Sequence, residues 1–219
     1  MLVGRLRRKG EKMESVEKQF TILSGNRILR ILKRHNISAF PKIIGVNKKG
    51  LKYKIKFEWI NGETIKYEEL GKCFLKLGKI HKENKIKNSK IGYITICHGD
   101  FHIGNIIKSK DGEYIFIDLT YINKGWNFSD LEYIDFYNIY DKEKYPWMLK
   151  NNDLFDHYLE GAEIKLNKKE RENVIQLITI KYLKKCIKNG IINKIPCNIE
   201  KRLLKDIMKN RSNLTNAST

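Results

Sequence analysis

Three oxygen-bearing side chains between residues 98 and 118 have the types and spacing that phosphoryl transfer requires. The string HGDFHIGN places Asn105 five positions after Asp100, and the segment YIFID ends at Asp118. Phosphoryl transfer needs one carboxylate to accept the proton of an attacking hydroxyl, and oxygen ligands to hold magnesium on the nucleotide phosphates. Aspartate and asparagine oxygens suit this hard cation far better than they suit zinc. The segment therefore predicts a magnesium-dependent phosphoryl-transfer site.

The elements that must position these side chains are predicted to be a strand, a loop and a hairpin. Residues 93–97 have the composition of a strand, which would deliver His98-Gly99-Asp100 to a loop. Asp111-Gly112 predicts the turn of a hairpin whose second strand runs on to Asp118. A lone His-x-Asp string is equally compatible with an exposed loop. The complete pattern H-G-D-x-x-x-x-N, followed by Ile-Asp-Leu, favours a catalytic loop.

The first 60 residues are predicted to form a small strand–helix–hairpin unit. From Leu51 to Trp59, apolar side chains alternate with charged ones, which is the period of a half-buried strand. Residues 47–50 supply the turn of this hairpin, which spans residues 41–60. A helix is predicted over residues 25–35, and short strands are predicted over residues 1–20.

Residues 61–210 are predicted to be mostly helical, and residues 211–219 to be a frayed polar tail. Six residues of the first helix recur at the spacing of one helix face: Leu70, Cys73, Phe74, Leu77, Ile80 and His81. Further helices are predicted over residues 129–140, 154–164, 168–188 and 198–209.

The string HGDFHIGNII at residues 98–107 resembles the catalytic-loop signature of the aminoglycoside phosphotransferases and choline kinases, the small-molecule branch of the protein-kinase-like fold. FEWINGE at residues 57–63 is similar to the hinge of that family, and IDLTY at residues 117–121 matches the position of its second metal-binding aspartate. SDLEYID at residues 129–135 resembles the element after a shortened activation segment. The lipopolysaccharide-core sugar kinases share much of this pattern and are a close second.

The resemblance implies an α+β, protein-kinase-like bilobal fold with a shortened N-terminal β lobe and a mostly helical C-terminal lobe. It implies a kinase that moves the γ-phosphate of ATP to a hydroxyl of an aminoglycoside, amino alcohol or sugar, with Mg²⁺ as the second cofactor. In that scheme Asp100 is the catalytic base, and Asn105 and Asp118 bind magnesium. In the same scheme His98 and Asp130 support the loop, and Glu58 and Ile60 of the hinge contact the nucleotide.

The N-terminal residues depart from the family pattern. No G-x-G-x-x-G string is present, and GRLRRKG at residues 4–10 is the nearest glycine-containing turn. Lys18 is the predicted lysine for the α- and β-phosphates, and Lys12 is the second choice. The helix that should offer a glutamate to this lysine, GNRILRILKRHN, has no acidic residue, so Glu14 or Glu17 would have to substitute. These departures bear on nucleotide affinity more than on the fold.

Composition argues against several other classes of protein. Of the 219 residues, 41% are hydrophobic, which is sufficient for a core. No apolar run approaches the roughly 20 residues that span a bilayer, and no apolar segment follows the basic start. The four cysteines are scattered without a CxxC pair. These features predict a cytoplasmic protein without a membrane span, a disulfide framework or a zinc site.

The net charge of +19 is compatible with nucleic-acid binding, but its distribution weighs against a specific nucleic-acid partner. Most basic residues are lysines, and residues 91–160 contain about 6 basic and about 12 acidic residues. No basic motif interleaved with aromatic residues is present. The predicted partners are therefore a nucleotide and a small-molecule acceptor. A catalytically weak kinase-like binding protein comes second, and a nucleic-acid-binding module comes last.

Overall fold

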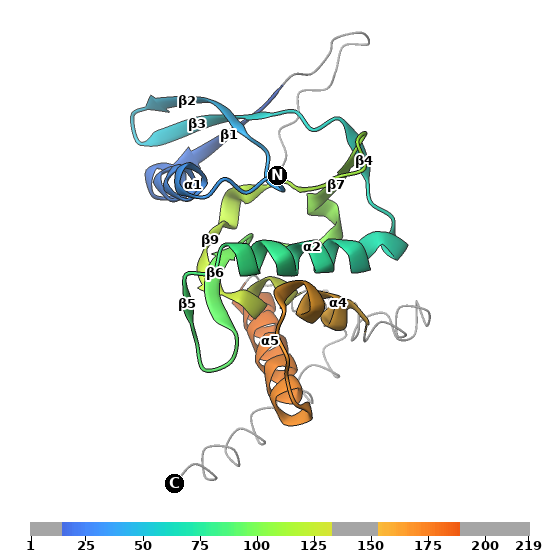
Figure 1. The fold of residues 1–219 in the computed structure, drawn as a ribbon. Coiled ribbons are helices and arrows are strands. Elements are labelled where there is room, and N and C mark those ends of the chain that lie inside the picture. The colour runs from blue at the N-terminus through green and yellow to red at the C-terminus, as the bar shows by residue number, and fades with distance from the viewer. Residues whose placement is uncertain (1–14, 133–152, 189–219) are drawn as a thin grey trace. The chain divides into compact units, whose positions relative to one another are not determined.

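The structure is a computed structural model that describes residues 15–132 and 153–188, which fall into two units. The first unit contains residues 15–130 and 153–164, and the second contains residues 131–132 and 165–188. Figure 1 shows the elements coloured in chain order. Lys18 and the other described residues with a predicted role lie in the first unit. The domain boundaries predicted at residues 60 and 210 stay predictions.

The first unit begins with an antiparallel sheet whose strands have the order β1-β3-β2. They are β1 (Ser15–Thr21), β2 (Ile43–Lys49) and β3 (Lys52–Glu58). In β3, Ile55 and Phe57 are buried and the lysines beside them are exposed, as the predicted alternation requires. The predicted turn is displaced: β2 continues through Lys49, and Gly50 and Leu51 make the turn because Gly50 tolerates a φ of 55°.

Helix α1 (Ile22–Arg34) packs on this sheet. It starts three residues before the predicted Gly25, because the side chain of Thr21 accepts a hydrogen bond from Ser24 N at 3.3 Å and caps the helix. Its apolar residues Ile28 and Ile31 are buried. A Cβ at position 25 would lie 2.4 Å from the ring of Tyr53, so Gly25 permits the close approach of helix and strand.

Helices α2 (Leu70–Glu83) and α4 (Asp153–Ala162) pack against each other. All six residues predicted to share one face of α2 are buried, which confirms that helix face: Leu70, Cys73, Phe74, Leu77, Ile80 and His81. A Cβ on Gly78 would lie 2.4 Å from the carbonyl oxygen of Tyr158, and one on Gly161 would lie 2.0 Å from that of Leu75. The two glycines therefore allow the helices to touch along their backbones.

Two further antiparallel sheets surround the predicted catalytic loop. One has the order β5-β6-β9, with strands β5 (Lys87–Asn88), β6 (Tyr93–Cys97) and β9 (Asn123–Trp126). The other has the order β4-β7-β8, with strands β4 (Gly62–Thr64), β7 (Ile106–Ser109) and β8 (Tyr114–Phe116). The sequence predicted β6 and the β7–β8 hairpin. It did not predict β4, β5 and β9, which are too short to show a period.

Short 3-10 helices complete the connections of the first unit: η1 (Tyr67–Glu69), η2 (Ile103–Asn105) and η3 (Leu119–Tyr121). A fourth, η4 (Asn127–Leu131), stands where the start of a helix over residues 129–140 was predicted. The rest of that helix, the helix predicted over residues 198–209 and the strands predicted before residue 15 lie outside the described residues.

In the second unit, α5 (Lys168–Lys188) has the predicted bounds. It begins with a reciprocal cap, since Asn167 Oδ1 accepts from Glu170 N and Glu170 Oε2 accepts from Asn167 N, both at 2.9 Å. Among the helices in the described ranges, none combines the length and hydropathy needed to cross a bilayer.

Candidate active site

The predicted catalytic loop follows β6 directly and turns at a glycine. Gly99 has a φ of 83°, and a Cβ at this position would lie 2.3 Å from the carbonyl oxygen of Tyr121. A larger residue is therefore disfavoured both by backbone strain and by lack of space. The turn directs the N–H groups of His98 and Gly99 to one carboxylate, that of Asp130.

Asp130 holds the loop although its side chain is buried, with 2% of the residue exposed. Its Oδ2 accepts from His98 N at 2.6 Å, and its Oδ1 accepts from Gly99 N at 2.7 Å. His81 Nε2 lies 3.1 Å from Oδ2. Burial opposes ionisation, but the hydrogen bond and charge of His81 and the N–H donors of the loop outweigh it. The pKa of Asp130 therefore lies below its ordinary value, and the residue is a charged brace.

His81, Cys97 and Asp130 bring three potential metal-ligand atoms within 4.8 Å of one another. Both ring nitrogens of His81 already have partners, because Nδ1 lies 2.9 Å from Tyr158 Oη and Nε2 faces Asp130. Cys97 Sγ donates to the carbonyl oxygen of Trp126 at 3.4 Å. We therefore assign this buried cluster to bracing of the loop.

His98 connects the loop to the segment that precedes Asp118. Its Nε2 donates to the carbonyl oxygen of Ile117 at 2.7 Å, so Nδ1 is the unprotonated nitrogen that accepts from Asp100 N at 3.3 Å. The ring is fully buried, and burial lowers the pKa of His98 although Asp130 and the other carboxylates nearby oppose this shift. A neutral His98 therefore fixes both ends of the site through hydrogen bonds.

Asn105 and Asp100 are joined by hydrogen bonds. Asn105 Nδ2 donates to the backbone oxygen of Asp100 at 2.8 Å and lies 3.4 Å from Asp100 Oδ2. The ring of His102 is nearby, with Nε2 3.0 Å from Asn105 Nδ2 and 3.7 Å from Asp100 Oδ2. These contacts use the amide nitrogen of Asn105, so its amide oxygen is turned away from the backbone of Asp100.

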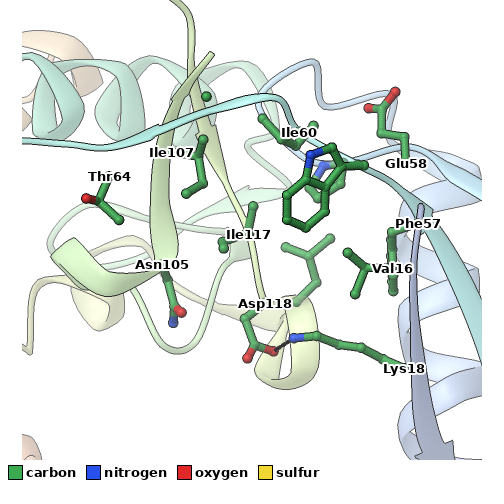
Figure 2. Close-up of a pocket in the computed structure, with 14 residues that line it drawn as sticks. Val16, Lys18, Phe57, Glu58, Ile60, Thr64, Asn105, Ile107, Ile117 and Asp118 are labelled. Atoms are coloured by element: carbon green, nitrogen blue, oxygen red, sulfur yellow. Dashed lines mark ion pairs between the residues drawn. The ribbon is translucent and has the colours of Figure 1, made fainter. Parts of the chain in front are cut away.

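Asp118, the residue before η3, has a left-handed backbone, at φ 62° and ψ 64°, which is uncommon for a residue with a side chain. Its Oδ1 lies 2.7 Å from Lys18 Nζ and accepts from Thr120 Oγ1 at 2.6 Å. Partial burial would raise the pKa of Asp118, but the Lys18 ammonium and the Thr120 hydroxyl outweigh it and hold the pKa below its ordinary value. The carboxylate is therefore charged, and Figure 2 shows it paired with the Lys18 ammonium.

Among the described residues, Lys18 of β1 pairs with this carboxylate and with no glutamate. Helix α1 contains no acidic residue, and Glu17 forms its ion pair with Lys54, at 2.9 Å. The glutamate partner expected from the family resemblance therefore has no equivalent among the described residues. Lys12 and Glu14, which could also have formed this pair, lie outside the described residues.

A contact that the sequence did not predict joins α1 to the turn after Asp118. Arg27 Nη2 donates to the carbonyl oxygen of Thr120 at 3.0 Å. Its Nε is buried and has no hydrogen-bond partner among the described residues. Because Thr120 also donates to Asp118, Arg27 is linked to the Asp118 carboxylate through one intermediate residue, Thr120. The one signal in the sequence was that this helix is basic where the resemblance leads one to expect an acid.

A pocket of about 330 Å³ lies beside these polar groups (Figure 2). Lys18, Asn105 and Asp118 line it on one side, and its other walls are mainly apolar. Val16 lines it because it lies on the same face of β1 as Lys18, two positions away. The two-residue period of a strand is the signal in the sequence that could have identified Val16 as a lining residue. Further lining residues that the sequence did not single out are Pro41, Phe57, Trp59, Gly62, Thr64, Ile107, Ile117 and Leu119.

The two predicted hinge residues also line this pocket. Glu58 Oε1 accepts from Lys42 N at 2.8 Å, so its carboxylate ties β3 to the segment before β2. In Figure 2 this carboxylate points away from Asp118, whereas Ile60 lies among the apolar walls. Asp100 is not a lining residue, and it is connected to the pocket through its hydrogen bond with Asn105.

Asn105 and Asp118 fit the ligand preferences of magnesium. Both line the same pocket and offer oxygen, the donor that Mg²⁺ prefers. The low pKa of Asp118 keeps its carboxylate charged at neutral pH. The Lys18 ammonium 2.7 Å from Asp118 Oδ1 shows that this position accommodates positive charge.

Comparisons with known proteins find similarity in structure but not in sequence. No protein-family model and no curated protein sequence matches the chain. The choline kinase of Streptococcus pneumoniae is 12% identical with a TM-score of 0.54, over 89% of this chain and 86% of that one. A choline/ethanolamine kinase family protein of Mesorhizobium loti is 11% identical with a TM-score of 0.52, over 97% of this chain and 88% of that one. An aminoglycoside phosphotransferase of Streptomyces rimosus, in complex with ADP and streptomycin, is 11% identical with a TM-score of 0.52. The similarity covers 74% of this chain and 84% of that one.

These similarities define the class of fold: the chain has the α+β, protein-kinase-like fold of the small-molecule phosphotransferases. The α+β, protein-kinase-like fold class predicted from the sequence is confirmed, and the bilobal arrangement stays a prediction. The structural neighbours are aminoglycoside phosphotransferases and choline kinases, the group that the catalytic-loop string resembles. The likeness to the lipopolysaccharide-core sugar kinases and the roles of the individual site residues stay predictions.

Proposed function

We propose that this chain is an ATP-dependent kinase that transfers the γ-phosphate to a hydroxyl of a small molecule. The proposal rests on one arrangement: Lys18, Asn105 and Asp118 line a single pocket with apolar walls, and Asp100 is hydrogen-bonded to Asn105. An apolar cleft with a few polar groups at one side suits a nucleotide, because the base is flat and weakly polar and the phosphates are charged. The neighbour from Streptomyces rimosus was solved with ADP, which supports this assignment.

Each polar group then has a distinct task. Asn105 and Asp118 would hold Mg²⁺ through their side-chain oxygens, and the ion would supply positive charge that offsets the charge of the β- and γ-phosphates. Lys18 holds the α- and β-phosphates from β1. Asp100 accepts the proton of the acceptor hydroxyl, and the contacts of its backbone with His98 and Asn105 hold it in the loop. Glu58 and Ile60 border the part of the pocket that takes the base.

The acceptor is an aminoglycoside, an amino alcohol or a sugar, including a lipopolysaccharide saccharide. We assign the protein to the cytoplasm, where ATP is available. A second candidate function is nucleotide binding with little transfer. It is favoured by the absence of an acidic residue from α1 and by the direct pairing of Lys18 with Asp118, because both differ from the expected phosphate-holding arrangement.

The test is a magnesium–ATP phosphorylation screen over aminoglycosides, choline, ethanolamine and sugars, with products identified by mass spectrometry. Asp100→Asn should bind magnesium–ATP nearly as well as the native chain but transfer phosphate at least about 10²-fold more slowly, because the amide keeps the shape and cannot take the proton. Asp111→Asn, in the exposed β7–β8 turn, is the matched control and should be fully active. A native chain that binds nucleotide but phosphorylates no acceptor would instead support the second candidate.

A further inference from the structure

The two most exposed large apolar side chains of the described residues lie at one end of the β1-β3-β2 sheet. Leu23 is 82% exposed in the first turn of α1, and Leu51 is 81% exposed in the β2–β3 turn. Thr21 pairs with Lys52, so both leucines lie within two residues of the same pair. The contact at Gly25 fixes the first turn of α1 against β3. In Figure 1, α1 and the β2–β3 turn both lie toward the left of the view.

Exposed lysines flank Leu51 in the sequence. Lys48 and Lys49 precede the β2–β3 turn and Lys52 follows it, and none of the three has an ion-pair partner among the described residues. The wider region is also basic, because residues 18–57 contain eleven lysines and arginines and no aspartate or glutamate. Of these eleven, Lys18 pairs with Asp118 and Lys54 pairs with Glu17. We call Leu23, Lys48, Lys49, Leu51 and Lys52 the leucine–lysine tip.

We propose that the leucine–lysine tip docks this protein on an anionic lipid bilayer. A peripheral protein needs two signals for stable attachment, and the tip offers both: apolar side chains that enter the headgroup–acyl boundary and lysines that bind anionic headgroups. Leucines exposed by this amount in water gain by transfer to that boundary. The leucines come from two segments that β-sheet pairing brings together, so the surface is created by the fold.

A bilayer fits the tip better than a nucleic acid does. Proteins that bind single-stranded nucleic acids stack bases on exposed aromatic rings, and phosphate forks favour arginine. The five tip residues contain neither type. A nucleic-acid partner would also have no use for Leu23 and Leu51, whose exposure in water is unfavourable.

Docking through the tip leaves the nucleotide pocket accessible. The pocket is lined by Val16 and Phe57, which pair with each other on the sheet. That pair is five residues along the strands from the pair Thr21–Lys52, a separation of about 17 Å. The tip and the pocket therefore occupy opposite ends of one sheet, and the docking proposal does not depend on the proposed kinase activity.

The experiment is vesicle co-sedimentation of the full chain, with phosphatidylcholine vesicles and with vesicles that also contain phosphatidylglycerol. We expect binding to the anionic vesicles that weakens as salt is added. Replacing both tip leucines by serine should weaken it by about a hundredfold, at about tenfold for each leucine. Replacing the three tip lysines by glutamine should also weaken it by about a hundredfold, at about fivefold for each lysine.

The matched control replaces three exposed lysines outside the tip by glutamine, Lys79, Lys90 and Lys110, which removes the same charge elsewhere. This control should bind within about fivefold of the native chain. Because the substituted side chains are exposed, all variants should keep the native circular dichroism spectrum and melting temperature.

Three results would overturn the proposal. The first is that the native chain does not bind anionic vesicles. The second is that the control and the tip-lysine variants lose vesicle affinity equally, which would mean that the net positive charge of the whole protein, and not the tip, attracts the vesicles. The third is vesicle binding that survives in the double-leucine variant while a single-stranded oligonucleotide competes for the tip lysines, which would identify a nucleic-acid surface.

Discussion

The replacement Asp130→Asn removes one negative charge from the most buried carboxylate of the site and keeps its shape. In the native chain the two carboxylate oxygens accept from two different backbone donors, Gly99 N at 2.7 Å and His98 N at 2.6 Å. An asparagine has one oxygen, so its NH₂ group must face either Gly99 N or both His98 N and His81. One charge-assisted hydrogen bond is therefore lost, and one buried donor is left without an acceptor.

The expected loss of stability follows from these two terms. A hydrogen bond to a charged group contributes about 1.5–3 kcal/mol, and an unsatisfied buried donor costs about 1–3 kcal/mol. Their sum agrees with the about 3–5 kcal/mol measured when one partner of a buried charged pair is removed. For a chain of this size the melting temperature should fall by about 6–20 °C. Phosphate transfer should fall as well, because Asp130 orients the loop that carries Asp100.

The assay is thermal and urea unfolding of Asp130→Asn beside Asp111→Asn, whose carboxyl group is exposed in a turn. Because the folded pKa of Asp130 lies below the ordinary 3.8, its stabilisation is complete above that pH and is lost as the pH falls through the folded pKa. The native chain should therefore lose stability between pH 5 and the acid limit more steeply than the variant does, on the order of one extra proton bound on unfolding. A melting temperature that matches the control would show that Asp130 does not hold the loop.

Three further predictions concern the polar side of the pocket. Asp118→Asn should abolish magnesium-dependent ATP binding and leave the fold intact, and unchanged magnesium–ATP affinity by calorimetry would exclude Asp118 as a ligand. Lys18→Ala should raise the Michaelis constant for ATP and lower turnover together, whereas a defect in Lys12→Ala alone would transfer the phosphate-holding role to that residue. Arg27→Ala should raise the magnesium concentration needed for half-maximal ATP binding by about 5- to 30-fold, since one hydrogen bond of about 1–2 kcal/mol no longer holds the turn after Asp118. Arg30→Ala, which changes an exposed arginine on the same helix, is the control for Arg27→Ala. An equal effect of the two replacements would mean that the loss of positive charge, and not the hydrogen bond to Thr120, causes the change.

Local pattern was sufficient for the parts of this protein whose structure depends on neighbours in sequence. The buried face of α2 was predictable because five apolar residues and His81 repeat with the helical period, which one element can show by itself. The β7–β8 hairpin was predictable because Asp111-Gly112 fits a tight turn, and Gly112 has a φ of 83°. The string around Asp100, Asn105 and Asp118 predicted the fold class, which the structural neighbours confirm.

Other features depended on contacts between distant residues, for which a single sequence has no signal. Strand β9 has four residues, and its pairing with β6 is visible only once the loop after Asp118 has folded back. The start of α1 shifted to Ile22 because Thr21 caps it, although residues 22–24 alone show no helical period. The hinge residue Glu58 could be placed near the pocket, but the bond from Lys42 N to its carboxylate could not be foreseen.

The sequence by itself determined which oxygen-bearing groups this protein possesses and the order in which they occur, because the strand, loop and hairpin that carry them are local structures. Only the tertiary structure decided how Lys18 is used. Its partner is Asp118, 100 positions later in the chain, and the contact exists because the sheet of β1 meets the turn after β8. The same dependence holds for Arg27, whose acceptor on Thr120 is 93 positions away. A residue's chemistry is fixed by its side chain, but its partner is fixed by packing, and packing is a property of the whole folded unit.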